Sequence, residues 1–390
     1  MRILFASPNH WFSPFQVGSH HLARRFVAAG WRAAYVSDPI SPWHFLKGVS
    51  KDLRDRWRVF RQGGIEDLDG RLWTYVPAAC LTPHRYWIVR SRWVHRHWYQ
   101  LTWPNVVTKA RQAGFGSVDL LYLDSLHQSF WLDTLDYRRS VFRLADYSPK
   151  HPKVTNATRD FERKMAQRVD LVVYPSPRLR GYAESLRPKR LLYVPNGVDF
   201  GHFARGDWPV PMEYRQLDGP IAVYVGVMPR WFHFDWVREA AKQLPAFSFV
   251  LIGPDQLARR EFAGMRNVHC LGFRDYSIVP AYLHHADVGL MPFNVAVDAN
   301  AVEALNPQKL YAYLAAGLPV VAADWETLRE LQSPVRRCRT AGEFAQAIAD
   351  AAAHPGDCEA RRWFASRFDW RFRMEQMLAE LGFAARQPAA

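Results

Sequence analysis

The stretch NPQKLYAYLAAGLPVVAAD, Asn306 to Asp324, combines a helix start, a helix stop and a buried strand. Asn306 suits an N-cap, and Pro307 suits the first helical position, where a missing N–H costs nothing. Gly317 suits the left-handed residue that follows a helix, and the apolar run from Val320 has the length of a short buried strand. The stretch therefore predicts a helix, a tight turn and a strand, which is the repeating unit of an α/β fold.

Lys309 lies in the first turn of this predicted helix. The backbone dipole already presents positive charge there, so a cation is disfavoured by about 0.3–1 kcal/mol. The position makes physical sense if an anion completes the arrangement, and helix N-termini bind phosphates well. We therefore expect a phosphate at Lys309; the alternative is a solvated lysine.

Strand and helix signals alternate along the whole chain. RILFAS predicts a buried strand, the segment from Gly18 an amphipathic helix, and RAAYVSD a second strand, which together form a βαβ unit. We predict two facing Rossmann-like domains, residues 1–200 and 220–365, joined by a linker at residues 201–219 that is rich in Pro, Gly and polar residues. Ligands of open α/β sheets bind at the carboxyl ends of the strands, so we expect the site in a cleft between the domains.

Length and composition agree with this plan. A chain of 390 residues, of which 49% are hydrophobic, is long enough for two domains that each bury a core. The four cysteines are far apart and show no CxxC or CxxH spacing, so we expect neither a disulfide framework nor a zinc site, and a reduced, cytosolic compartment. The N-terminal apolar run is too short for a signal peptide, and no stretch approaches about 18 uninterrupted apolar residues. An integral membrane protein is therefore not expected.

The positive charge is concentrated near the N-terminus. The chain carries a formal charge of +14, and residues 1–116 hold 17 Lys plus Arg against 6 Asp plus Glu, a net of +11. Within an insertion at about residues 43–111, the segment from His84 to Arg111 contains no acidic residue and interleaves Trp with Arg. Nucleic acid and anionic lipid headgroups both attract such surfaces, and tryptophan favours the membrane interface. The alternative is a solvated basic helix whose tryptophans belong to the core.

We predict that this surface holds the protein, as a peripheral protein, on the inner face of the cytoplasmic membrane. The predicted membrane surface consists of Arg85, Trp87, Arg90, Arg92, Trp93, Arg96 and Trp98. A nucleic-acid partner is not expected, because the sequence contains no nucleic-acid recognition motif.

Four stretches point together to a family. They are VPNGVDFGHF, YVGVMPRWFHFDWV, LGFRDYSIVPAYLHHADVGLMPF and the stretch quoted first. Their order and spacing resemble those of bacterial GT-B glycosyltransferases, and the chain is most similar to the branch that holds the xanthan glucuronosyltransferase and the teichuronic acid glycosyltransferases. The resemblance covers residues 141–324 well, the first strand and helix loosely, and residues 47–111 hardly at all.

The resemblance implies an α/β fold of the GT-B type and a glycosyltransferase. Such an enzyme moves a sugar from a nucleoside-diphosphate sugar, with UDP as the expected nucleotide, to an acceptor hydroxyl. We expect a lipid-linked or amphiphilic acceptor in bacterial polysaccharide or glycoconjugate synthesis. Residues 366–390 are expected to form a closing helix that crosses back to the first domain. GT-B enzymes generally do not depend on a metal, so we expect no metal cofactor and interpret the DLD at Asp67–Asp69 as a turn.

The donor-binding residues follow from the same resemblance. Lys309 matches the lysine near the donor diphosphate, and Gly226 with Met228 matches the turn after the first strand of the domain, where a flexible methionine can lie against the base. Residues 272–274 lie where the family commonly binds the base through backbone groups. For Met228 and Phe273 ordinary loop packing is the alternative. The implied donor-binding set is Gly226, Met228, Arg230, Gly272, Phe273, Arg274, Asn306 and Lys309. A glucuronic acid donor would need an extra cation, for which Arg230 is one candidate.

Two positions in the helix region depart from the pattern of retaining members of the superfamily. Those members carry two glutamates eight positions apart, and the matching residues here are Ala304 and Ala312. Glu303 is one residue out of register, which turns a helical side chain by about 100°. The retaining arrangement is absent, which favours an inverting reaction.

An inverting transfer needs a base that takes the proton of the acceptor hydroxyl. Asp146, in VFRLADYSPKHP, lies just past a predicted strand end and matches the aspartate regarded as the base in the xanthan glucuronosyltransferase. The alternative is a loop or N-cap aspartate bound by backbone N–H groups. Candidates for sugar or acceptor binding are Gly18, Asp124 and His127, and the last two are the next candidates for the base.

Two other functions remain as alternatives. A retaining transferase with atypical catalytic residues would be distinguished by the anomer of its product. A catalytically silent protein that binds nucleotide-sugars or polyanions would not hydrolyse any donor.

Overall fold

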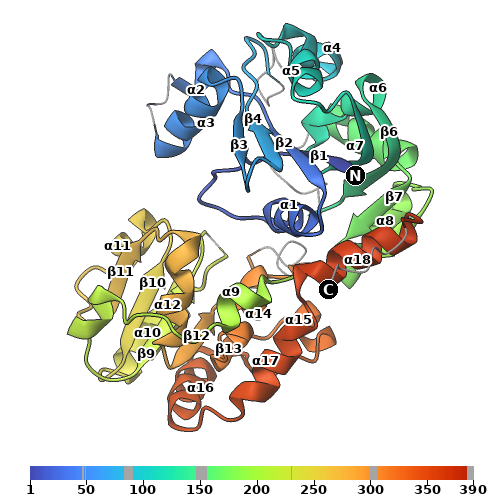
Figure 1. Ribbon diagram of the computed structural model, residues 1–390. Helices are drawn as coiled ribbons and strands as arrows, with labels where there is room; N and C mark the ends of the chain where they lie inside the picture. The colour runs from blue at the N-terminus through green and yellow to red at the C-terminus, as the bar shows by residue number, and fades with distance from the viewer. Residues whose placement is uncertain are drawn as a thin grey trace. The chain divides into compact units, whose positions relative to one another are not determined.

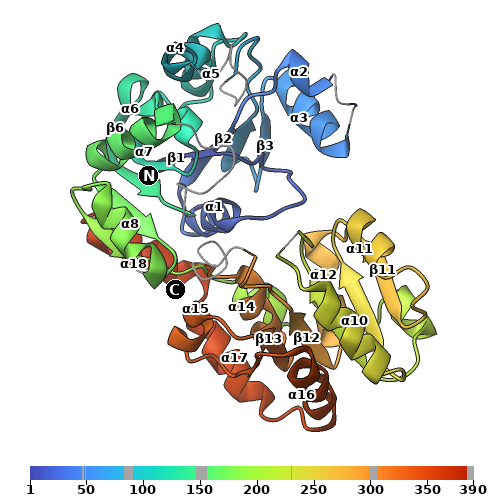
Figure 2. The same ribbon diagram turned by 180° about the vertical axis from the view of Figure 1, so that it is seen from behind.

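The computed structural model describes residues 1–45, 48, 50–82, 91–145, 156–229, 231–297 and 305–383. The chain forms two compact units, and unit 1 combines the blue-to-green N-terminal part of the chain with the red helix α18 in Figures 1 and 2. Unit 1 comprises Met1–Pro195 and Arg373–Ala390, and unit 2 comprises Asn196–Phe372. Within the described residues, no helix combines the length and the apolar character needed to span a bilayer.

Unit 1 is built on an eight-stranded sheet with the order β3-β4-β2-β1-β5-β6-β7-β8. Its strands are β1 (Arg2–Ser7), β2 (Arg32–Ser37), β3 (Ile65–Asp67), β4 (Leu72–Tyr75), β5 (Ser117–Leu123), β6 (Asp136–Arg143), β7 (Leu171–Tyr174) and β8 (Leu191–Tyr193). All neighbours pair in parallel except β3 with β4. Every residue of β1 but the first is buried, as expected for a central strand covered on both faces. The order of the strands reverses between β1 and β5, which is the position where doubly wound sheets bind ligands.

Helices cover both faces of this sheet (Figure 1). They are α1 (Gly18–Ala28), α2 (Pro42–Phe45), α3 (Lys51–Arg61), α4 (Arg92–His97), η1 (Trp98–Leu101), α5 (Val106–Gln112), η2 (Leu126–Gln128), α6 (Trp131–Thr134), α7 (Asn156–Arg168), η4 (Pro177–Leu179) and α8 (Arg180–Ser185). The closing helix is α18 (Trp370–Glu380). It belongs to unit 1 from Arg373 onward, where Gln376 Nε2 donates to the carbonyl of Tyr193 at 3.0 Å.

Unit 2 contains a six-stranded, wholly parallel sheet with the order β11-β10-β9-β12-β13-β14. Its strands are β9 (Ile221–Val225), β10 (Ser248–Ile252), β11 (Val268–Gly272), β12 (Val288–Met291), β13 (Val320–Ala323) and β14 (Val335–Cys338). Its helices are α9 (Phe200–Ala204), η5 (Met212–Gln216), α10 (Phe234–Gln243), α11 (Gln256–Glu261), η6 (Tyr276–Ile278), α12 (Val279–His284), α14 (Gln308–Ala315), α15 (Glu326–Glu330), α16 (Ala341–Ala353) and α17 (Cys358–Ser366). The order is that of a classic Rossmann sheet, and it reverses between β9 and β12.

Residues 201–219, predicted as a linker, are instead part of unit 2. They contain most of α9 and all of η5, and Phe203 and Tyr214 are buried in the core of that unit. The prediction was wrong because the apolar residues of this segment are scattered among Pro, Gly and polar residues and give no periodic signal. The chain passes from one unit to the other earlier, between Pro195 and Asn196.

The stretch from Asn306 to Asp324 folds as a helix, a turn and a strand. Gly317 has φ = 81°, and its N–H donates to the carbonyl of Leu314 at 3.0 Å, which closes the helix. The start differs from the prediction, because α14 begins at Gln308 and Pro307 takes the N-cap position. Asn306 does not cap the helix, since its Oδ1 accepts a hydrogen bond from the hydroxyl of Tyr311 at 2.9 Å.

Candidate functional site

Three glycines end neighbouring strands at the carboxyl edge of the unit 2 sheet: Gly226 after β9, Gly253 after β10 and Gly272 at the end of β11. Gly226 and Gly253 have φ values of 145° and 147°, which side chains rarely allow. The N–H of Gly226 donates to Ile252 at 2.8 Å, and that of Gly253 donates to Gly272 at 2.9 Å. A Cβ on Gly253 would collide with the carbonyl oxygen of Gly226. Glycine is therefore required at this position for the ends of β9 and β10 to pack against each other.

Lys309 reaches this edge from the first turn of α14. A Cβ on Gly226 would lie 2.7 Å from Lys309 Nζ, so the glycine leaves the space that the ammonium group occupies. Nζ donates to the hydroxyl of Tyr224 at 2.8 Å. It lies 4.2 Å from the ring centroid of Tyr224 and 4.9 Å from that of Phe293, which follows β12. Three separate elements thus place one amine between two aromatic rings.

The electrostatics of Lys309 are those of a cation without a counter-charge. In the described part of the chain no carboxylate pairs with it, and burial lowers its pKa to about 7. A buried ammonium is costly in water-poor surroundings unless an anion compensates it. An anion bound here would raise the pKa of Lys309 and hold it in its charged form.

Asn306, one turn away from Lys309, supplies a second hydrogen-bond donor that has no acceptor among the described residues. Its side chain is 4% exposed. The Oδ1 atom is bonded to Tyr311, but Nδ2 is buried and has no hydrogen-bond partner among the described residues. An unmade buried hydrogen bond costs about 1–3 kcal/mol, so this donor is suited to a ligand oxygen.

The strand order reverses at this point, and β9 and β12 separate. They pair only through Ala222 and Val223 of β9. Farther along, the N–H of Val225 donates to the hydroxyl of Tyr313 on α14 at 2.7 Å. Sequence reasoning missed Tyr224, Phe293 and Tyr313. Each occurs in or beside an apolar run that is typical of core, and only the folded sheet brings them to Lys309 and the strand ends.

The loop after β9 is fixed to the loop after β12. The N–H of His233 donates to Pro292 at 2.7 Å, and that of Asn294 donates to Trp231 at 2.6 Å. Within this loop Met228 is 5% exposed and belongs to the core cluster, which is the packing role given as its alternative. Arg230 lies outside the described residues.

The predicted base-binding stretch at the end of β11 is partly exposed to solvent. The side chain of Phe273 is 40% exposed. The guanidinium of Arg274 is used within the unit, because it pairs with Glu213 and donates to the Tyr282 hydroxyl at 2.9 Å. Arg274 therefore holds η5 against this loop, and only its backbone is left for a ligand.

In unit 1, Asp124 and His127 follow β5. The side chains of Asp124 and Arg143 are 4% and 10% exposed, and Asp124 Oδ1 lies 3.4 Å from Arg143 Nη1. The ring of His127 lies 5.5 Å from that of His95, and its Nδ1 is buried without a partner among the described residues. Gly18 is the first residue of α1 and is buried. Asp146, the predicted base, lies outside the described residues.

A buried polar chain that the sequence did not reveal fixes the loop after β1. The hydroxyl of Tyr35 donates to Ser7 Oγ at 2.9 Å and lies 3.2 Å from His20 Nδ1. His20 Nε2 donates to the carbonyl of His10 at 3.0 Å, and His10 Nε2 donates to Asp52 at 3.0 Å. Burial lowers the pKa of His20 to about 4, so its ring is neutral at physiological pH. These hydrogen bonds connect the end of β1 and the loop after it to α1, β2 and α3.

The predicted membrane surface is described only in part. Arg85, Trp87 and Arg90 lie outside the described residues, as does the side chain of Arg92. On α4, Trp93 is 56% exposed and Arg96 is also exposed. Trp98 was assigned to this surface wrongly: it is 0% exposed, and its Nε1 donates to the carbonyl of His127 at 2.7 Å. Residue spacing alone does not distinguish a tryptophan on the buried side of a short helix from an exposed one.

Comparisons with known proteins match both units. The family model described as the N-terminal domain of the glucuronosyltransferase GumK matches residues 5–175, and the model described as glycosyl transferases group 1 matches residues 219–354. The putative teichuronic acid biosynthesis glycosyltransferase TuaH of Bacillus subtilis is 29% identical over 201 residues, 48% of this chain and 50% of that protein. The chain thus spans about half the length of the curated relative that it matches.

Solved structures are similar over almost the whole chain. Sucrose-phosphate synthase from Thermosynechococcus elongatus has a TM-score of 0.64 at 16% identity, covering 97% of this chain and 96% of that one. HepE from Anabaena in complex with UDP has a TM-score of 0.64 at 16% identity, covering 98% and 99%. At this level of identity, the similarity shows a shared fold.

Proposed function

We propose that the chain is a glycosyltransferase of the GT-B type, in the branch of the xanthan glucuronosyltransferase and the teichuronic acid glycosyltransferases, and that it transfers a sugar from a UDP-sugar to a hydroxyl of a lipid-linked or amphiphilic acceptor. The name of TuaH supports a role in polysaccharide synthesis, and the UDP complex of HepE supports UDP as the nucleotide.

The observation that carries the donor proposal is the partly buried amine of Lys309, which lies between two aromatic rings beside Gly226 and has no carboxylate partner among the described residues. The diphosphate would accept hydrogen bonds from Lys309 Nζ and from the unpaired Nδ2 of Asn306. Gly226 leaves room for Lys309 Nζ at the strand end, and the exposed ring of Phe273 would lie near the base. When the sugar is transferred, negative charge develops on the leaving diphosphate, and a preorganised ammonium stabilises that charge.

An inverting reaction is the second part of the proposal. Position 312, where retaining relatives carry a glutamate, is a buried alanine on α14. The acceptor proton would then go to a base of unit 1, and Asp146 is the proposed base from its match to the family. Asp124 is less suited to this role, because its carboxylate already faces the guanidinium of Arg143.

A panel of nucleotide sugars tests the donor assignment. Thermal unfolding would be followed with UDP-, GDP-, ADP- and TDP-sugars, and a ligand at about 100 times its Kd should add about 2.7 kcal/mol of stability. We expect stabilisation by UDP-sugars and a clearly smaller stabilisation of the Lys309→Met variant. Stabilisation by another nucleotide alone, or an equal effect on the variant, would contradict the proposal.

A peripheral position on the inner face of the cytoplasmic membrane completes the proposal. The exposed Trp93 and Arg96 on α4, together with the acid-free segment around them, support it. An acceptor with a lipid anchor would then lie on the same surface as the enzyme.

A further inference from the structure

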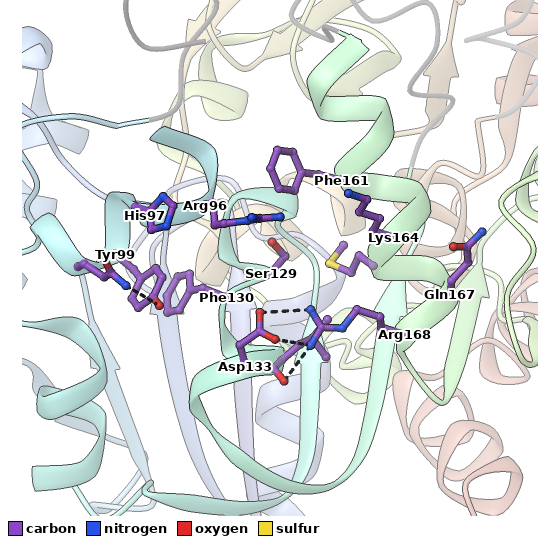
Figure 3. A pocket seen from close by; sticks show the side chains of 13 residues that line it. Arg96, His97, Tyr99, Ser129, Phe130, Asp133, Phe161, Lys164, Gln167 and Arg168 are labelled. Carbon is purple, nitrogen blue, oxygen red and sulfur yellow. Dashed lines mark hydrogen bonds and ion pairs between the residues drawn. The ribbon is translucent and has the colours of Figure 1, made fainter. Parts of the chain in front are cut away.

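A pocket of about 500 Å³ in unit 1 is lined by none of the residues assigned above to donor, acceptor or catalysis. Its walls come from α4 with η1, from the residues after η2 with α6, and from α7 (Figure 3). No role has been given to it so far. Its rim on α4 and η1 belongs to the segment that we propose to contact the membrane.

The floor of the pocket is apolar and held by ring contacts. Tyr99 stacks on Phe130 with ring centroids 4.4 Å apart and an angle of 8°. Phe161 stacks on His95 of α4 with centroids 5.3 Å apart, and Met165 on α7 is buried. These contacts tie α4 and η1 to the neighbouring helices, so the pocket is preformed.

The rim of the pocket carries excess positive charge. Arg168 binds the carboxylate of Asp133 through two hydrogen bonds of 2.6 and 3.2 Å, so these two charges compensate each other. Arg96 and Lys164 point toward one another across the pocket (Figure 3). Among the described residues neither has a carboxylate partner. Two cations that face the same space favour an anion between them.

Large exposed apolar side chains are close to these rim residues along the chain. Trp93 is 56% exposed, Leu101 is 38% exposed and Trp103 is 84% exposed, all on α4, η1 or the residues that follow. Exposed tryptophans beside cations are typical of surfaces at the membrane–water interface. A water-soluble anion would account for the cations but would leave both tryptophans exposed to water.

We propose that this pocket binds the phosphate of an anionic lipid headgroup. Arg96 and Lys164 share the phosphate, and Trp93 and Trp103 enter the interface beside it. The inference rests on the proposed membrane association and adds to it a specific headgroup site, so that one lipid molecule fixes the orientation of unit 1.

Co-sedimentation with phosphatidylglycerol vesicles, compared with phosphatidylcholine vesicles, tests the site. Arg96→Ala/Lys164→Ala should weaken binding to phosphatidylglycerol about 30-fold, the effect of two cations at an anionic surface. The matched control is Lys51→Ala/Arg61→Ala, which removes the same charges from α3 and should change binding by less than about threefold. A thermal shift with UDP-glucose checks that each variant keeps its fold and its donor site.

A variant without a change in charge distinguishes binding in the pocket from general electrostatic attraction to the vesicle. Ser129→Leu places a larger side chain at the centre of the pocket and should weaken phosphatidylglycerol binding without changing the net charge; Ser185→Leu, exposed on α8, should not. Equal losses in the two charge variants, or full binding by Ser129→Leu, would overturn the headgroup site while membrane association stands. Absence of wild-type binding to phosphatidylglycerol would overturn both.

Discussion

The affinity for UDP-glucose should fall as the pH rises from about 6 to about 8.5, because Lys309 must be protonated to bind the diphosphate. In the empty site burial lowers the pKa of Lys309 to about 7. The side chains that face its ammonium are Tyr224 from β9 and Phe293 from the loop after β12. Burial raises the pKa of Tyr224 well above its usual value, so neither neighbour is charged. A bound diphosphate adds negative charge beside the amine and raises its pKa.

The sign and size of the effect follow from linkage. Binding takes up a proton wherever the amine is neutral in the free protein and charged in the complex. The affinity is therefore constant well below pH 7 and falls about tenfold, or about 1.4 kcal/mol, for each pH unit above it. Between about pH 6 and 8.5 we expect a loss of about 30-fold, with uptake of about 0.5 proton at pH 7 and about 0.9 at pH 8.

Isothermal titration calorimetry in buffers of different ionisation enthalpy measures both quantities. UDP-glucose suits the assay, because both of its phosphates are diesters and do not titrate in this range. Lys309→Met keeps an apolar side chain of similar length and should bind more weakly, without pH dependence and without proton uptake. A wild-type affinity that stays constant across the range, with an enthalpy that is the same in every buffer, would refute the role of Lys309.

Three other outcomes are expected. Gly226→Ala should weaken UDP-glucose binding at least about tenfold and cost about 1–3 kcal/mol of stability, since its Cβ meets Lys309 Nζ at a strained φ; unchanged titration and thermal unfolding curves would argue against this contact. Asp146→Asn should lower turnover about 10²- to 10⁴-fold with donor affinity unchanged, and near-normal steady-state kinetics would remove Asp146 as the base. Trp98→Ala should lower the free energy of unfolding by urea by about 3–5 kcal/mol, whereas the exposed Trp93→Ala should change it by less than about 0.5 kcal/mol; similar values for the pair would contradict their different burial.

The local order around α14 could be predicted from the sequence because it depends on near neighbours. Gly317 ends the helix through its own φ, and the apolar run after it has no alternative to burial. The start of the helix could not be predicted to the residue. Asn306 is a good cap by type, but the Tyr311 hydroxyl takes its Oδ1, and this contact depends on how α14 packs.

The sequence indicated that an anion binds at Lys309, but it did not reveal which side chains surround the amine. The position of Lys309 at the positive end of the helix dipole indicates a phosphate. This inference needs only one residue and the helix that contains it. The aromatic rings around its amine come from Tyr224 and Phe293, which are 85 and 16 positions away in the chain. Only the pairing of β9 with β12 brings them together, so no local pattern reveals them.

In the insertion, composition predicted the kind of partner but not which side chains are exposed to it. An acid-free run of Trp and Arg indicates an anionic partner, but it does not say which tryptophan faces it. Trp93 and Trp98 are five positions apart on consecutive helical turns, and one is exposed while the other is buried. Trp98 is buried because Phe130 and His127, from another part of unit 1, contact it.

The most direct test of the central claim is transfer of labelled sugar from UDP-sugars to a bacterial lipid extract, with the anomeric configuration of the product determined by NMR. We predict a glycolipid product with the configuration inverted relative to the donor, and no product from Lys309→Met. A product that retains the donor configuration would contradict the inverting mechanism. Absence of both transfer and donor hydrolysis with every UDP-sugar that stabilises the protein would contradict the enzyme itself.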